Sequence, residues 1–218
     1  MNNPSNSLSQ SSLFSKVSLL LTIAFSVSAF GTYLGQGITS VGAIIGLGIL
    51  MILGTIGVFI AAKKSPTAGI TALTIWSFVT GLFLGPCIHH YLITLGWQTV
   101  FLTYLGTGGV MAACGAVGAL SGINFSRLGN FLMVALLGMI VVGIFSIFIP
   151  MSHTVNIVYC IIGMIVFAGF FIVVFFRLAN SENTWEAAIE VTMNLFLDFL
   201  NFLLYALRLI ELLSGNKK

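Results

Sequence analysis

One acidic residue, Asp198, interrupts the apolar stretch LFLDFLN at residues 195–201. A charged side chain at the centre of a bilayer costs about 2.5–3.5 kcal/mol on insertion scales, so Asp198 is a candidate functional residue. Five other polar residues flank it at intervals of three or four positions, which places all six on one face of a helix. We call these six residues the polar seam: Glu190, Asn194, Asp198, Asn201, Tyr205 and Arg208.

The polar seam has two interpretations. Side chains such as Asn194, Asn201 and Tyr205 often serve as hydrogen-bonding partners between membrane helices. This explanation is weaker for Asp198, because an amide would do the same at a lower desolvation cost. Arg208 lies ten residues further along, about 15 Å away on a helix, so the sequence offers Asp198 no counter-charge. The acid must then be protonated, hydrated or occupied by a cation, which are the states that a proton or cation pathway requires.

The elements that position the seam follow from composition. Of 218 residues, 58% are hydrophobic and 6% are charged, against about 25% charged in soluble domains. Runs of about 20 apolar residues span a bilayer as helices, because lipid leaves no partner for an open backbone. We predict an all-α membrane protein, a single domain over residues 1–218, with seven transmembrane helices and the seam-bearing helix 7 at the bundle centre. The predicted spans are 18–37, 41–62, 68–95, 99–121, 129–150, 155–176 and 187–213.

The ends and the connectors indicate an orientation. Residues 1–16 are mostly polar and predict a disordered N-terminal tail. The cations Lys16, Lys63, Lys64, Arg127 and Arg177 fall on one side of a seven-span chain, which the positive-inside rule makes cytoplasmic, together with the N-terminus. Lys217 and Lys218 leave the side of the C-terminal tail open. The short loops favour a bacterial inner-membrane protein, and the scattered cations do not favour nucleic-acid binding.

Other residues give weaker signals. Pro86, after Gly85, lies within the third span and predicts a helix kink that either adjusts packing or acts as a hinge. The three cysteines, Cys87, Cys114 and Cys160, lie in apolar runs without metal-site spacing, so we expect buried packing roles. No paired acids or nucleophile motif accompany Asp198, so we expect neither enzyme activity nor a resident cofactor or metal; transient calcium contact at Asp198 is the exception.

The stretch LFLDFLNFLLYALRLI (195–210) resembles the C-terminal signature of the Bax inhibitor-1 family. Three more stretches agree with that family: TGLFLGP (80–86), NFSRLGNFL (124–132) and FAGF (167–170). The resemblance implies a seven-helix fold and a pH-sensitive calcium leak across a membrane, with Asp198 at the position of an acid in the central helix.

The resemblance also exposes departures. The family's helix 6 carries a second acid, but the matching run GFFIVVF (169–175) places Val174 there and Val173 at a neighbouring tyrosine position. The arginine that some members carry in helix 2 has no counterpart in residues 41–62. Two hypotheses therefore stand: a cation or proton conduit sensed at Asp198, and a non-conducting regulator that binds a membrane protease or another membrane complex.

Overall fold

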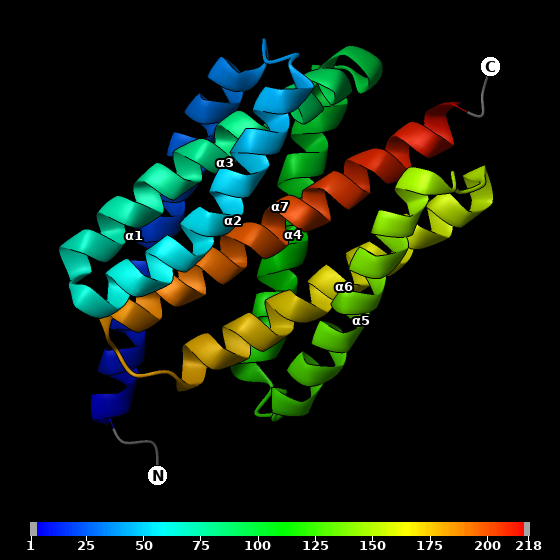
Figure 1. The fold of residues 1–218 in the computed structure, drawn as a ribbon. Helices are drawn as coiled ribbons and strands as arrows, with labels where there is room; N and C mark the ends of the chain where they lie inside the picture. The colour runs from blue at the N-terminus through cyan, green and yellow to red at the C-terminus, as the bar shows by residue number, and fades with distance from the viewer. Residues whose placement is uncertain (1–3, 216–218) are drawn as a thin grey trace. The chain divides into compact units, whose positions relative to one another are not determined.

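The computed structural model describes residues 4–215, and within them all side chains except those of residues 4–11 and 147. The described chain is all-helical, and its seven helices confirm the predicted fold class (Figure 1). The chain divides into two compact units, residues 1–93 with 180–196 and residues 94–179 with 197–218. The helices are α1 (Pro4–Gly35), α2 (Val41–Lys64), α3 (Pro66–Leu95), α4 (Trp97–Leu120), α5 (Ser126–Phe148), α6 (His153–Asn180) and α7 (Trp185–Gly215).

Local signals set the helix ends. Ser40 caps α2 by accepting from the Ala43 N–H, and Thr184 does the same for α7 through the Ala187 N–H. Gly96 and Gly122 have positive φ angles of 81° and 69° in the connections before α4 and α5, a conformation that side-chain-bearing residues rarely adopt. The predicted disordered tail is wrong for residues 4–16, because α1 already begins at Pro4. Proline suits the first helical position, where its missing N–H costs nothing; residues 1–3 lie outside the described residues.

In unit 1, α1 and α3 pack with their backbones in close contact. A β-carbon at Gly81 would collide with the backbone of Ser28, and one at Gly85 would collide with the backbone of Gly35. Small residues allow this approach, which supplies dispersion contacts where lipid provides no hydrophobic driving force. Ser77, fully buried on the same helix, donates to its own Leu73 carbonyl and so leaves no unsatisfied group.

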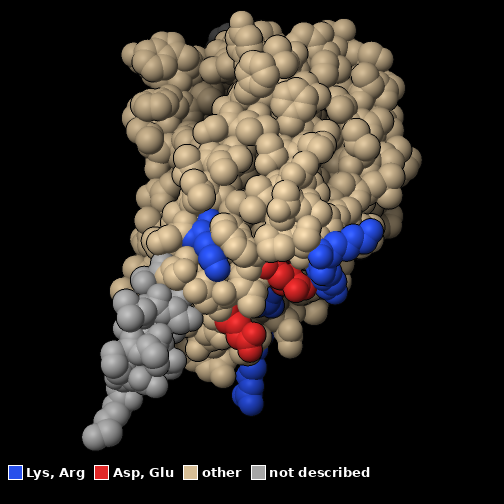
Figure 2. Space-filling view, turned by 90° about the vertical axis from the view of Figure 1, so that its left-hand side faces the viewer, with Lys and Arg blue, Asp and Glu red and all other residues tan. Residues whose placement is uncertain are grey.

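The charged residues of unit 1 lie at one end of that unit. Lys16 donates to the backbone and side-chain oxygens of Asn183 and lies 4.9 Å from the Trp185 ring centroid. The end of α2, next to Lys63 and Lys64, meets the start of α3 and the start of α7, because a β-carbon at Gly69 would touch both Ala62 and Ile189. Figure 2 shows acidic and basic side chains gathered at one end of the face in view, and the other described side chains in view are uncharged. Lys16, Lys63 and Lys64 thus share an end, as the sequence predicted.

In unit 2, α6 packs against both α4 and α5. A β-carbon at Gly118 on α4 would collide with the Ile172 backbone, and one at Gly129 on α5 would lie 3.2 Å from Val173. The same β-carbon, built at Gly129, would lie 3.6 Å from the Arg177 guanidinium. Arg127, the second residue of α5, lies two residues before Gly129, so the two arginines share one end of unit 2, as predicted.

Helix α7 takes part in both units, with its first part in unit 1 and its remainder in unit 2. Phe196 is fully buried and contacts Phe25 and Trp76, with ring centroids 5.2 and 5.4 Å away. In unit 2, Phe199 packs on Tyr104 at 4.9 Å and Phe202 on Phe171 at 6.0 Å. Aromatic contacts therefore hold α7 in each unit.

Six of the described helices, α1 to α6, are long and apolar enough to cross a membrane, which makes the chain a multi-pass membrane protein. Helix α7 is not among the six. Whether α7 also crosses the bilayer stays a prediction. The cysteines depart from expectation, since Cys160 is buried but Cys114 is half-buried and Cys87 is exposed. An apolar membrane helix has lipid-facing positions, so apolar neighbours in the sequence do not imply burial.

Candidate functional site

The polar seam is enclosed in its middle and exposed at its ends. In unit 1, Glu190 is exposed and Asn194 is half-buried. In unit 2, Asp198 is buried, Asn201 and Tyr205 are half-buried, and Arg208 is exposed. Glu190 and Arg208 therefore lie at the two exposed ends of the seam. Long charged side chains can keep their heads in water while their stems cover apolar surface.

Asp198 is buried without a hydrogen bond. Its residue exposure is 9%, and none of the hydrogen bonds among residues 4–215 involves its carboxyl group. The described residues also contain no fully sealed side-chain oxygen that lacks a partner. The Asp198 oxygens therefore each keep a small exposed surface. A carboxyl group that is mostly buried and unbonded within the protein can hold a proton, a water molecule or a cation.

The amides of the seam do not serve as partners of Asp198. Asn201 donates to the Leu197 carbonyl of its own helix at 2.8 Å, and Asn194 makes no hydrogen bond within the described part of the chain. Among the described residues, neither Asn194 nor Asn201 therefore forms the hydrogen bond between helices that the sequence suggested. The bond that Asn201 forms satisfies a polar group locally, as Ser and Thr do in other membrane helices.

Asp198 forms no salt bridge among the described residues, and the absence of a permanent counter-charge stays a prediction. The Arg177 guanidinium, near the end of α6, acts electrostatically on the Asp198 carboxyl within unit 2. Sequence reasoning assigned Arg177 to a connector, because it follows the apolar part of α6. A long side chain on the last turns of a helix can nonetheless influence a buried group on a neighbouring helix.

Two tyrosines on different helices form a pair next to the seam. The Tyr205 hydroxyl donates to the Tyr159 hydroxyl at 3.4 Å, and Tyr159 in turn donates to the Met139 carbonyl of α5 at 2.9 Å. The two rings meet edge to face at 5.7 Å. Gly163 leaves room for this arrangement, since a β-carbon there would lie 2.8 Å from the Tyr205 ring. Tyr205 therefore bridges helices, as one interpretation of the seam predicted.

A second bridge lies one turn further along α7. Arg208 donates to the Asn156 side-chain oxygen at 2.6 Å, and Asn156 donates to the carbonyls of Met151 and Ser152. Charge-assisted bonds of this kind are stronger than neutral ones. Sequence reasoning missed both Asn156 and Tyr159, although a signal was present: they lie three residues apart in an otherwise apolar helix, which places them on one face.

On α6, valines occupy the positions where the resemblance implied an acid and a tyrosine. Val173 and Val174 are both buried, and the residues that the structure describes contain no cluster of three or more His, Cys, Asp or Glu side chains. The site thus contains one buried acid, Asp198, and valine in place of a second carboxyl group.

The candidate hinge at Gly85 and Pro86 lies inside a continuous α3. Gly85 is buried, and a β-carbon there would lie 2.6 Å from the Cα of Gly35 and 2.8 Å from the Gln36 nitrogen. The contact with α1 gives Gly85 a packing role in unit 1. Hinge motion at this position stays a prediction.

Comparison with known proteins places the chain among membrane proteins. The family model described as "Inhibitor of apoptosis-promoting Bax1" matches residues 10–217. A protein of Schizosaccharomyces pombe named "Bax inhibitor 1" is 28% identical over 144 residues, which cover 66% of this chain and 52% of the yeast protein. An uncharacterized membrane protein of Vibrio cholerae is 27% identical over 203 residues, covering 91% of this chain and 87% of that protein. An uncharacterized membrane protein of Streptococcus pyogenes serotype M6 is 26% identical over 155 residues, covering 68% of this chain and 66% of its own length.

Proposed function

Since the chain belongs to the Bax inhibitor-1 family, we propose that it is a pH-sensitive pathway for cations or protons, with Asp198 as the titrating group. The observation that carries this proposal is the Asp198 carboxyl, which is buried and makes no hydrogen bond among the described residues. Ionisable groups at membrane depth are costly, and they commonly mark ion or proton pathways. A structural role would instead favour a bonded amide.

The neighbouring side chains provide polar groups on one side of Asp198. Asn201, Tyr205 and Arg208 extend the seam over ten residues, about 15 Å along the helix axis. The bonds from Tyr205 to Tyr159 and from Arg208 to Asn156 tie this part of α7 to α6. Protonation of Asp198 would change the electrostatics of α7 next to Arg177, and so bias how α7 packs within unit 2.

A single acid suits transit better than tight binding. Calcium sites in proteins usually combine six to eight oxygens, with several carboxylates among them. Asp198 with Asn201, backbone carbonyls and water offers fewer charges than such a site. Conduction requires binding weak enough for the ion to leave. We therefore assign calcium a transient contact at Asp198, with no resident metal, cofactor or enzymatic activity.

A second function is favoured by the valines of α6. Two neighbouring carboxyl groups can share a proton and switch sharply with pH, because both cannot ionise cheaply. Val174, buried at the position that the resemblance gives to the second acid, removes that pair. A non-conducting regulator that binds a membrane protease or another membrane complex would not need it. For either function we propose a bacterial inner membrane, with the N-terminus in the cytoplasm.

Flux through proteoliposomes tests the proposal. Purified protein is reconstituted, and the flux of calcium, monovalent cations and protons is measured from pH 5 to 8. Asp198→Asn keeps the shape of the side chain but removes its titration, so the pH dependence of flux should flatten. Glu190→Gln is the matched control, because Glu190 is an exposed acid on the same helix and should leave the profile unchanged. An unchanged profile in Asp198→Asn, or no flux in the unaltered protein, would favour the regulator.

A further inference from the structure

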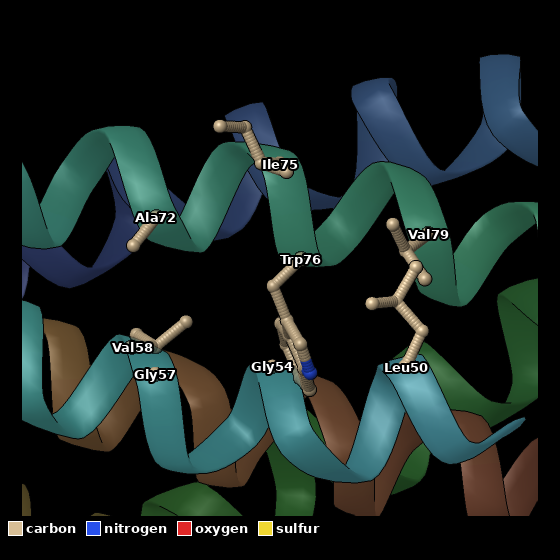
Figure 3. Close-up of a pocket in the computed structure, with 8 residues that line it drawn as sticks. All are labelled: Leu50, Gly54, Gly57, Val58, Ala72, Ile75, Trp76 and Val79. Carbon is tan, nitrogen blue, oxygen red and sulfur yellow. The ribbon is translucent and has the colours of Figure 1, made fainter. Parts of the chain in front are cut away.

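An apolar groove lies between α2 and α3 in unit 1, away from the polar seam. Its volume is about 290 Å³. Figure 3 shows the two helices side by side, with Trp76 reaching from α3 toward α2 between Gly54 and the neighbouring aliphatic residues. The groove is lined by Leu50, Gly54, Gly57, Val58, Ala72, Ile75, Trp76 and Val79.

Two glycines of α2 create the space. A β-carbon at Gly54 would lie 2.7 Å from the Trp76 ring, whereas one at Gly57 would meet no atom within 4 Å. The Trp76 indole is itself fixed, because its N–H donates to the Met51 carbonyl at 3.0 Å and to the Thr55 hydroxyl at 3.2 Å. Trp76 is only 2% exposed, so it forms the floor of the groove with its polar atom satisfied.

The rim of the groove is open. Leu50 is 50% exposed and Ile75 is 61% exposed, and both belong to helices apolar enough to cross the membrane. From Leu50 to Val58 the groove follows nine residues of α2, or eight steps of 1.5 Å, about 12 Å along the helix axis. That length is similar to one leaflet of the hydrocarbon core, about half of ~30 Å. An acyl chain fits an apolar groove of this length and orientation.

One lysine stands in line with the groove. Leu50, Gly57 and Lys64 are spaced by seven residues, close to two helical turns, so they lie on nearly the same face of α2. Lys63 is turned about 100° further from the groove. Within the described residues neither Lys63 nor Lys64 forms an ion pair or side-chain hydrogen bond. Helix α3 begins at Pro66, immediately beyond, and its N-terminus adds partial positive charge.

We propose that the groove between α2 and α3 binds one anionic phospholipid, with an acyl chain along Trp76 and Gly57 and the phosphate headgroup at Lys64. The charge complementarity decides the occupant, because an apolar groove alone would accept any acyl chain. Lysines at a membrane surface attract anionic lipids. An ammonium group aligned with the groove converts that general attraction into a site with one position for the phosphate.

Native mass spectrometry of the purified full chain tests this site. The protein is titrated with phosphatidylglycerol or with phosphatidylcholine of the same acyl chains, and the affinity for the first bound lipid is compared. The unaltered protein should prefer phosphatidylglycerol by about fivefold or more, the effect of one lysine near a membrane surface. Lys64→Gln should remove most of that preference. Lys63→Gln carries the same loss of charge on the other face of α2 and should retain the preference.

The acyl part of the site is tested separately by Gly57→Leu, which places a side chain in the groove; its β-carbon meets no atom within 4 Å, and leucine has a higher helix propensity than glycine. This variant should lose the first bound lipid of either type. Gly46→Leu is the matched control, since a β-carbon at Gly46 also meets no atom within 4 Å but the residue does not line the groove. Equal losses in Lys63→Gln and Lys64→Gln would overturn the proposal in favour of diffuse surface charge. Unchanged lipid binding in Gly57→Leu, or no preference for phosphatidylglycerol in the unaltered protein, would overturn it as well.

Discussion

Replacement of Asp198 by leucine should make the protein more stable. Asp198 is 9% exposed and forms no hydrogen bond among the described residues, and an ionisable side chain at membrane depth costs about 2.5–3.5 kcal/mol on insertion scales. Asp198→Leu removes that cost and adds apolar contacts with the surrounding helices. We expect the free energy of unfolding to rise by up to about 2.5–3.5 kcal/mol, less any cost of the added side-chain volume. Asp198→Asn should give a smaller rise, because an amide is easier to desolvate than a carboxylate.

The assay is unfolding in detergent, by heating or by titration with a denaturing detergent, with helix content as the signal. Thr192→Val is the matched control. Thr192 is fully buried on the same helix, but its hydroxyl donates to the Ala188 carbonyl at 2.7 Å. Loss of this satisfied bond should be neutral or cost about 1 kcal/mol. The two substitutions should therefore have opposite signs or clearly different sizes.

The opposite result for Asp198 would refute the reasoning. Breaking a buried ion pair costs about 3–5 kcal/mol, because the remaining charge is stranded. If Asp198→Leu destabilises by that amount, Asp198 is paired in the native state, and Arg177 is the partner to test by a double-mutant cycle. A stability gain together with a flattened pH profile of flux would mean that the protein retains a destabilising acid for its function.

Two further predictions concern packing. Gly81→Leu should prevent the close contact of α1 with α3, because a β-carbon at this position already collides with the Ser28 backbone. We expect little folded protein by size-exclusion chromatography, whereas Gly46→Leu should elute normally. Normal elution of both variants would contradict the packing argument. Gly163→Ala should displace the Tyr205 ring, which lies 2.8 Å from the added β-carbon, and should lower the free energy of unfolding by about 1–3 kcal/mol. Thermal unfolding of Gly163→Ala, of Tyr205→Leu and of the double variant should show non-additive losses of stability. Additive losses would mean that Gly163 does not act through Tyr205.

The sequence by itself determined the seven helices. Each depends on local properties: the length of an apolar run, a capping side chain such as Ser40 or Thr184, and glycines with positive φ at Gly96 and Gly122. The sequence also singled out Asp198, because an acid in an apolar helix stands out whatever surrounds it. It failed at the start of α1, where a polar composition predicted disorder but the helix already begins at Pro4.

The tertiary structure decided which polar groups meet. Tyr159 lies 46 residues from Tyr205, and Asn156 lies 52 residues from Arg208, yet each pair is hydrogen-bonded. Periodicity gives the face of a helix but not the helix that packs against it, nor the axial offset between the two. For the same reason the effect of Arg177 on Asp198 and the groove beside Gly57 were not predictable from sequence. Each arises where two helices come together, and only the packed chain specifies that contact.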